Sequence, residues 1–128
     1  MKSLTSSTTG SDPSPTPMDV RDALSRLGND HELLSDIIGI FLEDSPALLE
    51  KIRRAVMGND PSALQRAAHS LKGLAATLSA EDVAAASRRL ELMGASNCLS
   101  DAVTAVTQLE TLLSELSSAA QGYIQHPR

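Results

Sequence analysis

Apolar residues recur at intervals of three and four along most of the chain, the spacing that places them on one face of an α-helix. The longest such run predicts a helix over 31–57, capped by Asn29 or Asp30 and interrupted at Pro46 by a kink or by the start of a new segment. Similar patterns predict further helices over 19–27, 61–78, 80–93 and 101–121. No segment shows the alternation of a strand, so we expect an entirely helical chain.

Polar and small residues punctuate this pattern where turns are needed. Asp60 followed by Pro61 is typical of an N-cap and the first residue of a helix. Ser79 and Asp82 predict a capping box for the helix over 80–93, which we expect Gly94 to end. Such short connections favour neighbouring helices that run in opposite directions.

The predicted fold class is therefore all-α, an antiparallel four-helix bundle with a short additional N-terminal helix covering one end. The chain has 128 residues, 41% of them hydrophobic but only 2% aromatic, so aliphatic side chains must fill the core. In the last helix the core stripe is expected to include Val103 and Val106. We expect the domain to span 18–121, between a disordered linker or tail at 1–17 and a flexible C-terminal tail at 122–128.

The charge and composition narrow the classes of partner. The formal net charge is −5 and no basic stripe runs along any segment, which argues against nucleic acid. No apolar run approaches the length of a membrane span, and 1–17 lacks the apolar stretch of a signal peptide. Cys98 is the one cysteine, so no disulfide can form within the chain. We therefore expect a cytoplasmic protein without membrane insertion.

His69 lies on the polar side of the helix predicted over 61–78. With successive residues about 100° apart around the axis, Leu64, Leu71 and Leu78 share one face, which we expect to be buried. His69 falls about 160° from Leu71, nearly opposite that face. Because the ordinary pKa of histidine is about 6.5, an exposed ring on a rigid helix is a competent nucleophile near neutral pH.

The residues around His69 are small, cationic or amide-bearing. Gly73, four positions later, leaves room for another protein surface to approach the ring, and Ala76 keeps the same face low. A glycine inside a helix costs about 1 kcal/mol relative to alanine, so its presence needs a reason. Lys72 could offset the charge of a phosphoryl group on the ring, and Gln65 could hydrogen-bond the ring or that group.

The remaining candidates for chemistry carry weaker signals. His31 and His126 are expected to be plain surface residues, and Cys98 has no partner for redox chemistry. No histidine or carboxylate stands four positions from a histidine in a metal-binding arrangement, so we expect no metal and no cofactor. Neither a Gly-rich phosphate loop nor a kinase motif indicates a nucleotide site.

The stretch AHSLKG at 68–73 resembles the signature of histidine-containing phosphotransfer (HPt) domains, His-x-Leu-Lys-Gly with a preceding alanine. The segment 26–56, with a phenylalanine followed closely by an acidic residue and a proline, is similar to the long helix of that family. RRLELMG at 88–94 matches the family's later Leu-Glu pair, and the resemblance covers roughly 18–118. Ser79 stands where the family often has a glycine, so we expect a slightly different turn there.

This resemblance implies a phosphocarrier of multistep His–Asp phosphorelays. His69 would receive a phosphoryl group, on Nε2 in the family, from an aspartate of a response-regulator receiver domain and pass it to another receiver. Lys72 would support the phosphoryl group and Gly73 would open access to the ring. Mg²⁺ is expected on the partner receiver. The resemblance further implies a monomer that acts as a stoichiometric intermediate without an ATP site.

Three further residues are candidates for docking a receiver. Ile40 falls on the outward side of its predicted helix although it is apolar. Arg66 and Ser62 lie on the same side of their helix as His69.

Two other interpretations stay open from the sequence. One is a non-catalytic helical-bundle domain that binds a protein partner and no longer uses His69. The other is the HPt module of a larger hybrid sensor kinase, in which 1–17 would be the linker to an upstream receiver.

Overall fold

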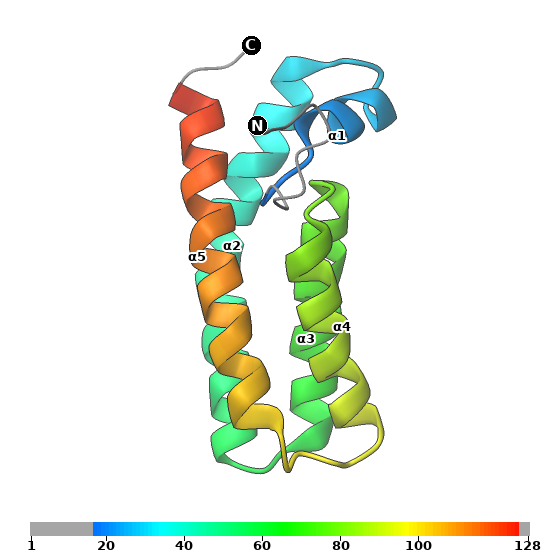
Figure 1. The fold of residues 1–128 in the computed structure, drawn as a ribbon, viewed down its shortest axis with the longest axis vertical. Helices are drawn as coiled ribbons and strands as arrows, with labels where there is room; N and C mark the ends of the chain where they lie inside the picture. Colours follow the sequence, from blue (N-terminus) through cyan, green and yellow to red (C-terminus); the bar gives the residue numbers. More distant parts are fainter. Residues whose placement is uncertain (1–16, 126–128) are drawn as a thin grey trace, which may run out of the picture.

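The computed structural model describes residues 17–125, and every regular element in that range is a helix. In chain order the helices are α1 (Val20–Arg26), α2 (His31–Met57), α3 (Pro61–Thr77), α4 (Glu81–Ala95) and α5 (Ala102–Gln125). The four long helices run alternately up and down, and α1 lies across the end where α3 turns into α4 (Figure 1). The predicted antiparallel four-helix bundle with a short N-terminal helix is confirmed.

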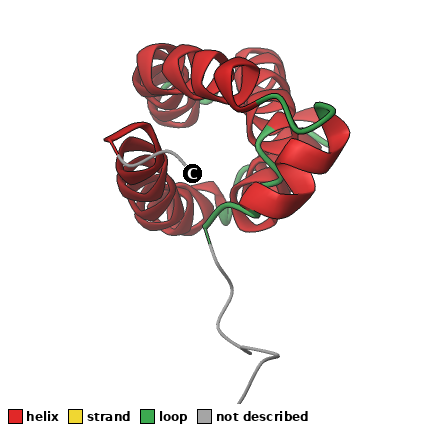
Figure 2. Cartoon of the chain, turned by 90° about the horizontal axis from the view of Figure 1, so that it is seen from above, coloured by secondary structure: helices red, strands yellow, loops and turns green. Residues whose placement is uncertain are grey.

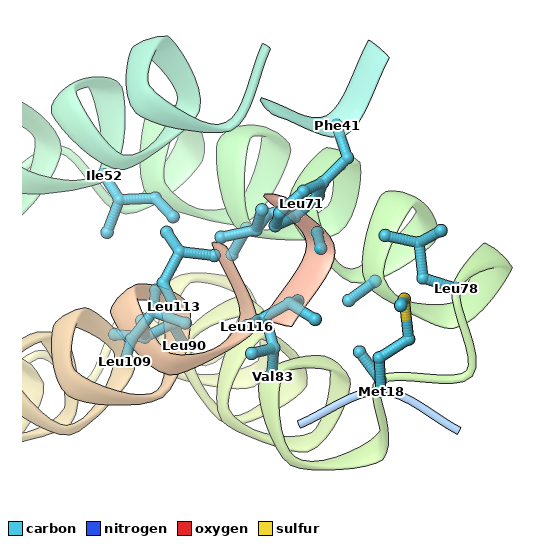
Figure 3. Packing of buried hydrophobic residues seen from close by; sticks show 14 of the residues in the cluster. Met18, Phe41, Ile52, Leu71, Leu78, Val83, Leu90, Leu109, Leu113 and Leu116 are labelled. Carbon is cyan, nitrogen blue, oxygen red and sulfur yellow. The ribbon is translucent and has the colours of Figure 1, made fainter. Parts of the chain in front are cut away.

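Viewed along the bundle, the long helices form a ring in which α2 contacts α3 and α5, and α4 contacts α3 and α5 (Figure 2). All four contribute to one buried cluster, represented by Phe41, Ile52, Leu71, Leu90 and Leu116 (Figure 3). Phe41 is the one phenylalanine of the chain, so aliphatic side chains fill most of the core, as the composition predicts. Within residues 17–125 no helix has the length and apolar character needed to cross a membrane.

The core faces predicted from helical spacing are largely confirmed. Leu64 and Leu71 are fully buried on α3. Val103 is the exception, because 65% of it is exposed. Ala102 and Val106 carry the buried stripe of α5 instead, and Val103 lies a quarter of a turn away from that stripe.

Each connection between helices contains a residue in the left-handed region, namely Asn29 (φ 63°), Asn59 (φ 52°), Ser79 (φ 53°) and Asn97 (φ 53°). Asparagine tolerates this conformation better than most residues, because its short polar side chain can bond locally. Asp30 and Asp60 follow two of these residues. Their carboxylates accept the backbone N–H three positions later, at 3.0 and 3.1 Å, which confirms both predicted N-caps.

The capping box predicted from Ser79 and Asp82 is wrong. Ala80 is the N-cap residue of α4 and makes no side-chain cap. Ser79 instead donates from Oγ to Asp22 on α1 and accepts from Arg26 at 2.7 Å. The left-handed serine therefore anchors α1 against the turn between α3 and α4. The slight difference from the family's turn stays a prediction.

Two helices continue past the points where breaks were expected. α2 is unbroken through Pro46, so no new segment starts there, and the helix on both sides is held by buried residues such as Phe41 and Ile52. α4 continues beyond Gly94 to Ala95. Gly94 is buried inside α4, and close packing against α3 accounts for the glycine.

The C-terminal helix is also longer than expected. α5 runs to Gln125, so 122–125 are helical and do not belong to a tail. Tyr123 explains the extension, because its ring is buried and stacks on His31 with 6.5 Å between the ring centres. Nδ1 of His31 lies 2.8 Å from the Tyr123 hydroxyl, so this exposed histidine is more than the plain surface residue expected. Residues 1–16 and 126–128, which include His126, lie outside the described part.

Candidate functional site

His69 occupies the middle of α3 with 66% of its side chain exposed. Its orientation follows from the opposite side of the helix, where Ala68, Leu71 and Ala75 are fully buried in the bundle. Because α3 is held by that face, the imidazole is presented to solvent from a rigid support. The exposure predicted from helical spacing is confirmed.

The imidazole is not isolated, because Glu91 reaches it from the neighbouring helix α4. Nδ1 of His69 lies 2.7 Å from Oε2 of Glu91. The other carboxylate oxygen, Oε1, lies 2.7 Å from Nζ of Lys72. One carboxylate therefore bridges the histidine and the lysine, and only 16% of the Glu91 side chain is exposed.

The charge state of Glu91 follows from these two contacts. The hydrogen bond from Lys72, and after it the one from His69, holds the pKa of the Glu91 carboxyl below its ordinary value. The group is therefore ionised at neutral pH and can only accept hydrogen bonds. Nδ1 of His69 must then carry the proton that it donates to Glu91. In the neutral ring this leaves the lone pair on Nε2, which is the nitrogen free of Glu91.

Lys72 is held in place, with 31% of its side chain exposed and its ammonium group paired with Glu91. This ion pair restrains the position of the ammonium group. For Gln65 no hydrogen bond to His69 is present within residues 17–125, and Glu91 takes the place predicted for it as the partner of the ring. The side chain of Gln65 is exposed on the same face, one turn before the histidine.

Gly73 and Ala76 are both exposed, one and two turns after His69 on the same face of α3. A Cβ atom built on Gly73 would meet nothing within 4 Å, so the interior packing of this chain does not require a glycine there. The absence of a side chain instead leaves open ground next to the ring. The access role of Gly73 and Ala76 stays a prediction, because it concerns the approach of a partner surface.

A groove between α2 and α3 runs past the histidine. Its α3 wall includes His69, Ser70 and Gly73, and its α2 wall includes Asp44 and Lys51. A second groove continues it toward the turn between the two helices. That groove is lined by Leu48, Lys51, Arg54, Ala55, Gly58, Asp60, Ala63, Arg66, Ala67 and Ser70.

The three docking candidates take different positions around this groove. Ile40 is 49% exposed and precedes Asp44 by one turn on α2, so it extends the wall of the groove beyond His69. Arg66 lines the opposite, cationic end and donates to Ser62 Oγ at 2.7 Å. Ser62 is not among the lining residues, and it orients Arg66 instead.

Glu91 is the site residue that the sequence reasoning missed. The Leu-Glu pair at 90–91 contributed to the family resemblance, but Glu91 received no role from it. A geometric signal was present, since two antiparallel helices joined by a tight turn pair residues at equal distances from that turn. Glu91 lies as far after Ala80 as His69 lies before it.

Within residues 17–125 no group of three or more histidine, cysteine, aspartate or glutamate side chains could hold a metal ion. Cys98 is exposed after α4, with its sulfur 4.0 Å from Oγ of Ser100.

Comparison with known proteins identifies the class. The Hpt domain family model matches residues 36–119. The crystal structure of histidine-containing phosphotransfer protein B (HptB) from Pseudomonas aeruginosa PAO1 is similar with a TM-score of 0.80 and 24% sequence identity, over 92% of this chain and 100% of that chain. This likeness shows a shared fold. A search of curated proteins found no match.

The family match spans well over half of the chain and includes α3 with His69. The chain therefore belongs to the Hpt domain family. It is a histidine phosphotransfer protein of the phosphorelay class.

Proposed function

We propose that His69 is the phosphorylated residue and that Nε2 is the atom that carries the phosphoryl group. The observation that carries this proposal is the hydrogen bond of 2.7 Å between Nδ1 of His69 and Glu91. It assigns the proton to Nδ1 and leaves the Nε2 lone pair for a reacting phosphorus. The exposure of the ring and the open ground at Gly73 support approach by a partner.

The arrangement suits a transfer that needs no proton movement. Nε2 attacks the phosphorus of a receiver's aspartyl phosphate, the N–P bond forms, and the P–O bond to the aspartate breaks, releasing a carboxylate. The ring keeps its Nδ1 proton and becomes a phosphorylated imidazolium, which the negative charge of Glu91 stabilises. In onward transfer, an aspartate of the next receiver attacks the phosphorus and neutral imidazole leaves. In both directions the reaction depends on placing the attacking and leaving atoms in line with the phosphorus. The receiver supplies the Mg²⁺.

Lys72 supports the phosphoryl group in this proposal. Its ammonium group pairs with Glu91 in the unmodified protein, within the same cluster as the ring. A phosphoryl group on Nε2 adds negative charge beside that cluster, so the ammonium group gains a second anionic partner. Gln65, one turn before His69, is an additional donor on the same face.

The receiver docks along the groove between α2 and α3 in this proposal. Ile40 offers an apolar contact on one side of His69, and the end near Arg66 offers positive charge on the other. Lys51 adds to that charge, since it makes no ion pair within the described residues. A receiver's phosphorylation pocket is acidic, so the positive end complements it and Ser62 keeps Arg66 oriented.

In this proposal the protein acts as a stoichiometric phosphoryl carrier in the cytoplasm. It is monomeric and has no ATP site of its own. Its partners are receiver domains of response regulators. If the chain is the phosphotransfer module of a hybrid sensor kinase, the receiver domain of that kinase is also a partner. Nucleic acid and membrane insertion have no part in this function.

The test is phosphoryl transfer from a phosphorylated receiver in the presence of Mg²⁺. The native chain and His31→Gln should both acquire an acid-labile, alkali-stable phosphate, whereas His69→Gln should acquire none. His31 is a matched control because it is an exposed histidine at the first residue of α2 and does not line the groove beside His69. If receivers that are shown to be phosphorylated transfer nothing to the native chain, the proposal fails and a non-catalytic binding domain becomes the better interpretation.

A further inference from the structure

Gly94 lies where the backbones of α3 and α4 come into close contact. A Cβ atom on this buried residue would lie 2.6 Å from the carbonyl oxygen of Pro61 and 2.8 Å from the backbone nitrogen of Gln65. Both are backbone atoms, so no side chain can turn aside to make room. By contrast, a Cβ atom on Gly122 would meet nothing within 4 Å.

This contact is one helical turn from the functional cluster on both helices. On α3, Gln65 precedes His69 by four residues, and on α4, Gly94 follows Glu91 by three. The separation of the two backbones at Gly94 therefore sets how far the Glu91 carboxylate must reach. With the helices in contact, it reaches Nδ1 of His69 and Nζ of Lys72 at 2.7 Å each.

We propose that Gly94 is a positioning residue for phosphoryl transfer, because it allows α3 and α4 to approach closely enough for Glu91 to bridge His69 and Lys72. Ordinary contacts of a Cβ atom begin near 3.4 Å, so a methyl group at Gly94 must push the two backbones apart. N–H···O hydrogen bonds weaken beyond about 3.2 Å, which leaves little slack in the bridge. The inference rests on the proposed function for its consequence in transfer, although the positioning itself is a property of the unmodified protein.

The experiment is NMR on the unphosphorylated chain, with ¹⁵N-labelled histidine and ¹³C-labelled glutamate. In Gly94→Ala the His69 ring should lose its preference for the Nδ1–H tautomer, and the Glu91 carboxyl pKa should rise toward its ordinary value of about 4.3. Gly122→Ala should leave both signals unchanged. Leu113→Ala, which truncates a buried side chain beside α2, should lower stability without moving either signal.

Glu91→Asp covers the case in which Gly94→Ala does not fold. It keeps the charge and the helix packing but shortens the reach of the carboxylate by one methylene. It should therefore cause the same loss of the Nδ1–H tautomer. A retained tautomer in Glu91→Asp, or in folded Gly94→Ala, would overturn the positioning role.

Phosphoryl transfer measured on the same samples separates this inference from the proposed function. Slower transfer to Gly94→Ala together with the altered ring signals is the expected result. If Gly94→Ala alters the His69 ring signals but the native chain accepts no phosphoryl group, the positioning role of Gly94 stands and the proposed phosphocarrier function is refuted. If transfer to Gly94→Ala is slower but its His69 ring signals are unaltered, the phosphocarrier function stands and the positioning role is refuted.

Discussion

Glu91 of α4 holds Nδ1 of His69 of α3 at 2.7 Å, and the same carboxylate holds Nζ of Lys72 at 2.7 Å. The proposed nucleophile, its tautomer and the ammonium group of Lys72 are thus held by one residue from a different helix. Four predictions follow from this cluster and from the surface around it.

Removing the carboxylate should slow transfer from a phosphorylated receiver to His69. In Glu91→Ala the ring loses the partner that keeps the proton on Nδ1, so fewer molecules present a free Nε2 lone pair. A hydrogen bond to a charged group contributes about 1.5–3 kcal/mol, which corresponds to a rate lowered roughly 10- to 100-fold. Glu91→Gln should lose less, since its amide oxygen still accepts from Nδ1. Single-turnover transfer from a phosphorylated receiver measures both, and equal rates for native and Glu91→Ala would contradict the role.

Glu91 should also make stability depend on pH in the acid range. Its folded-state pKa is lowered, chiefly by Lys72 and then by His69, so its contribution is present above the ordinary value of about 4.3 and is lost as pH falls through the folded value. Denaturant unfolding at several pH values should show the native chain more stable than Glu91→Gln at pH 7, with the difference shrinking below pH ~4. A difference that stays constant down to pH ~2 would show that the ion pair does not lower this pKa.

Gly73 should prove costly for stability and necessary for access. Gly73→Ala should raise the free energy of unfolding by about 1 kcal/mol, because the position is exposed, helical and free of steric demand. Gly73→Leu should also fold, yet transfer should fall by roughly 10- to 100-fold because the side chain keeps the receiver from its in-line approach. Gly122→Leu is the matched control on α5, where a Cβ atom is equally unobstructed. Full activity of Gly73→Leu would leave the glycine without an access role.

Ile40 should contribute to receiver affinity more than to stability. Ile40→Ala should weaken binding to a receiver about fivefold, equivalent to ~1 kcal/mol. This is the effect expected of an interface residue that is not a hot spot. The side chain is 49% exposed, so its loss should lower the free energy of unfolding by less than about 1 kcal/mol. Val103→Ala removes a comparably exposed apolar side chain from α5, diagonal to α3, and should leave affinity unchanged. Calorimetric titration with a receiver compares the two, and an unaltered affinity for Ile40→Ala would remove Ile40 from the docking surface.

The buried faces of the helices could be predicted from the order of residues alone. Apolar residues that recur every three or four positions form a pattern that depends only on residues near each other in the chain. That pattern identified α2, α3, α4 and α5 and placed His69 opposite the core face of α3. The caps at Asp30 and Asp60 are equally local, since the carboxylate bonds an N–H three residues away. The open position of Gly73 follows from the same periodicity.

Contacts between two helices could not be predicted in this way, because they depend on how the helices pack. Serine is a common N-cap residue, but the hydroxyl of Ser79 instead donates to Asp22 and accepts from Arg26, both on α1. The end of α5 was set by the packing of Tyr123 on His31. Glu91 became the partner of His69, and Gly94 came into close contact with the backbone of α3, only because α4 folds back along α3. A one-dimensional pattern shows which way each side chain faces, whereas the distance between two helices is fixed by the atoms that pack between them.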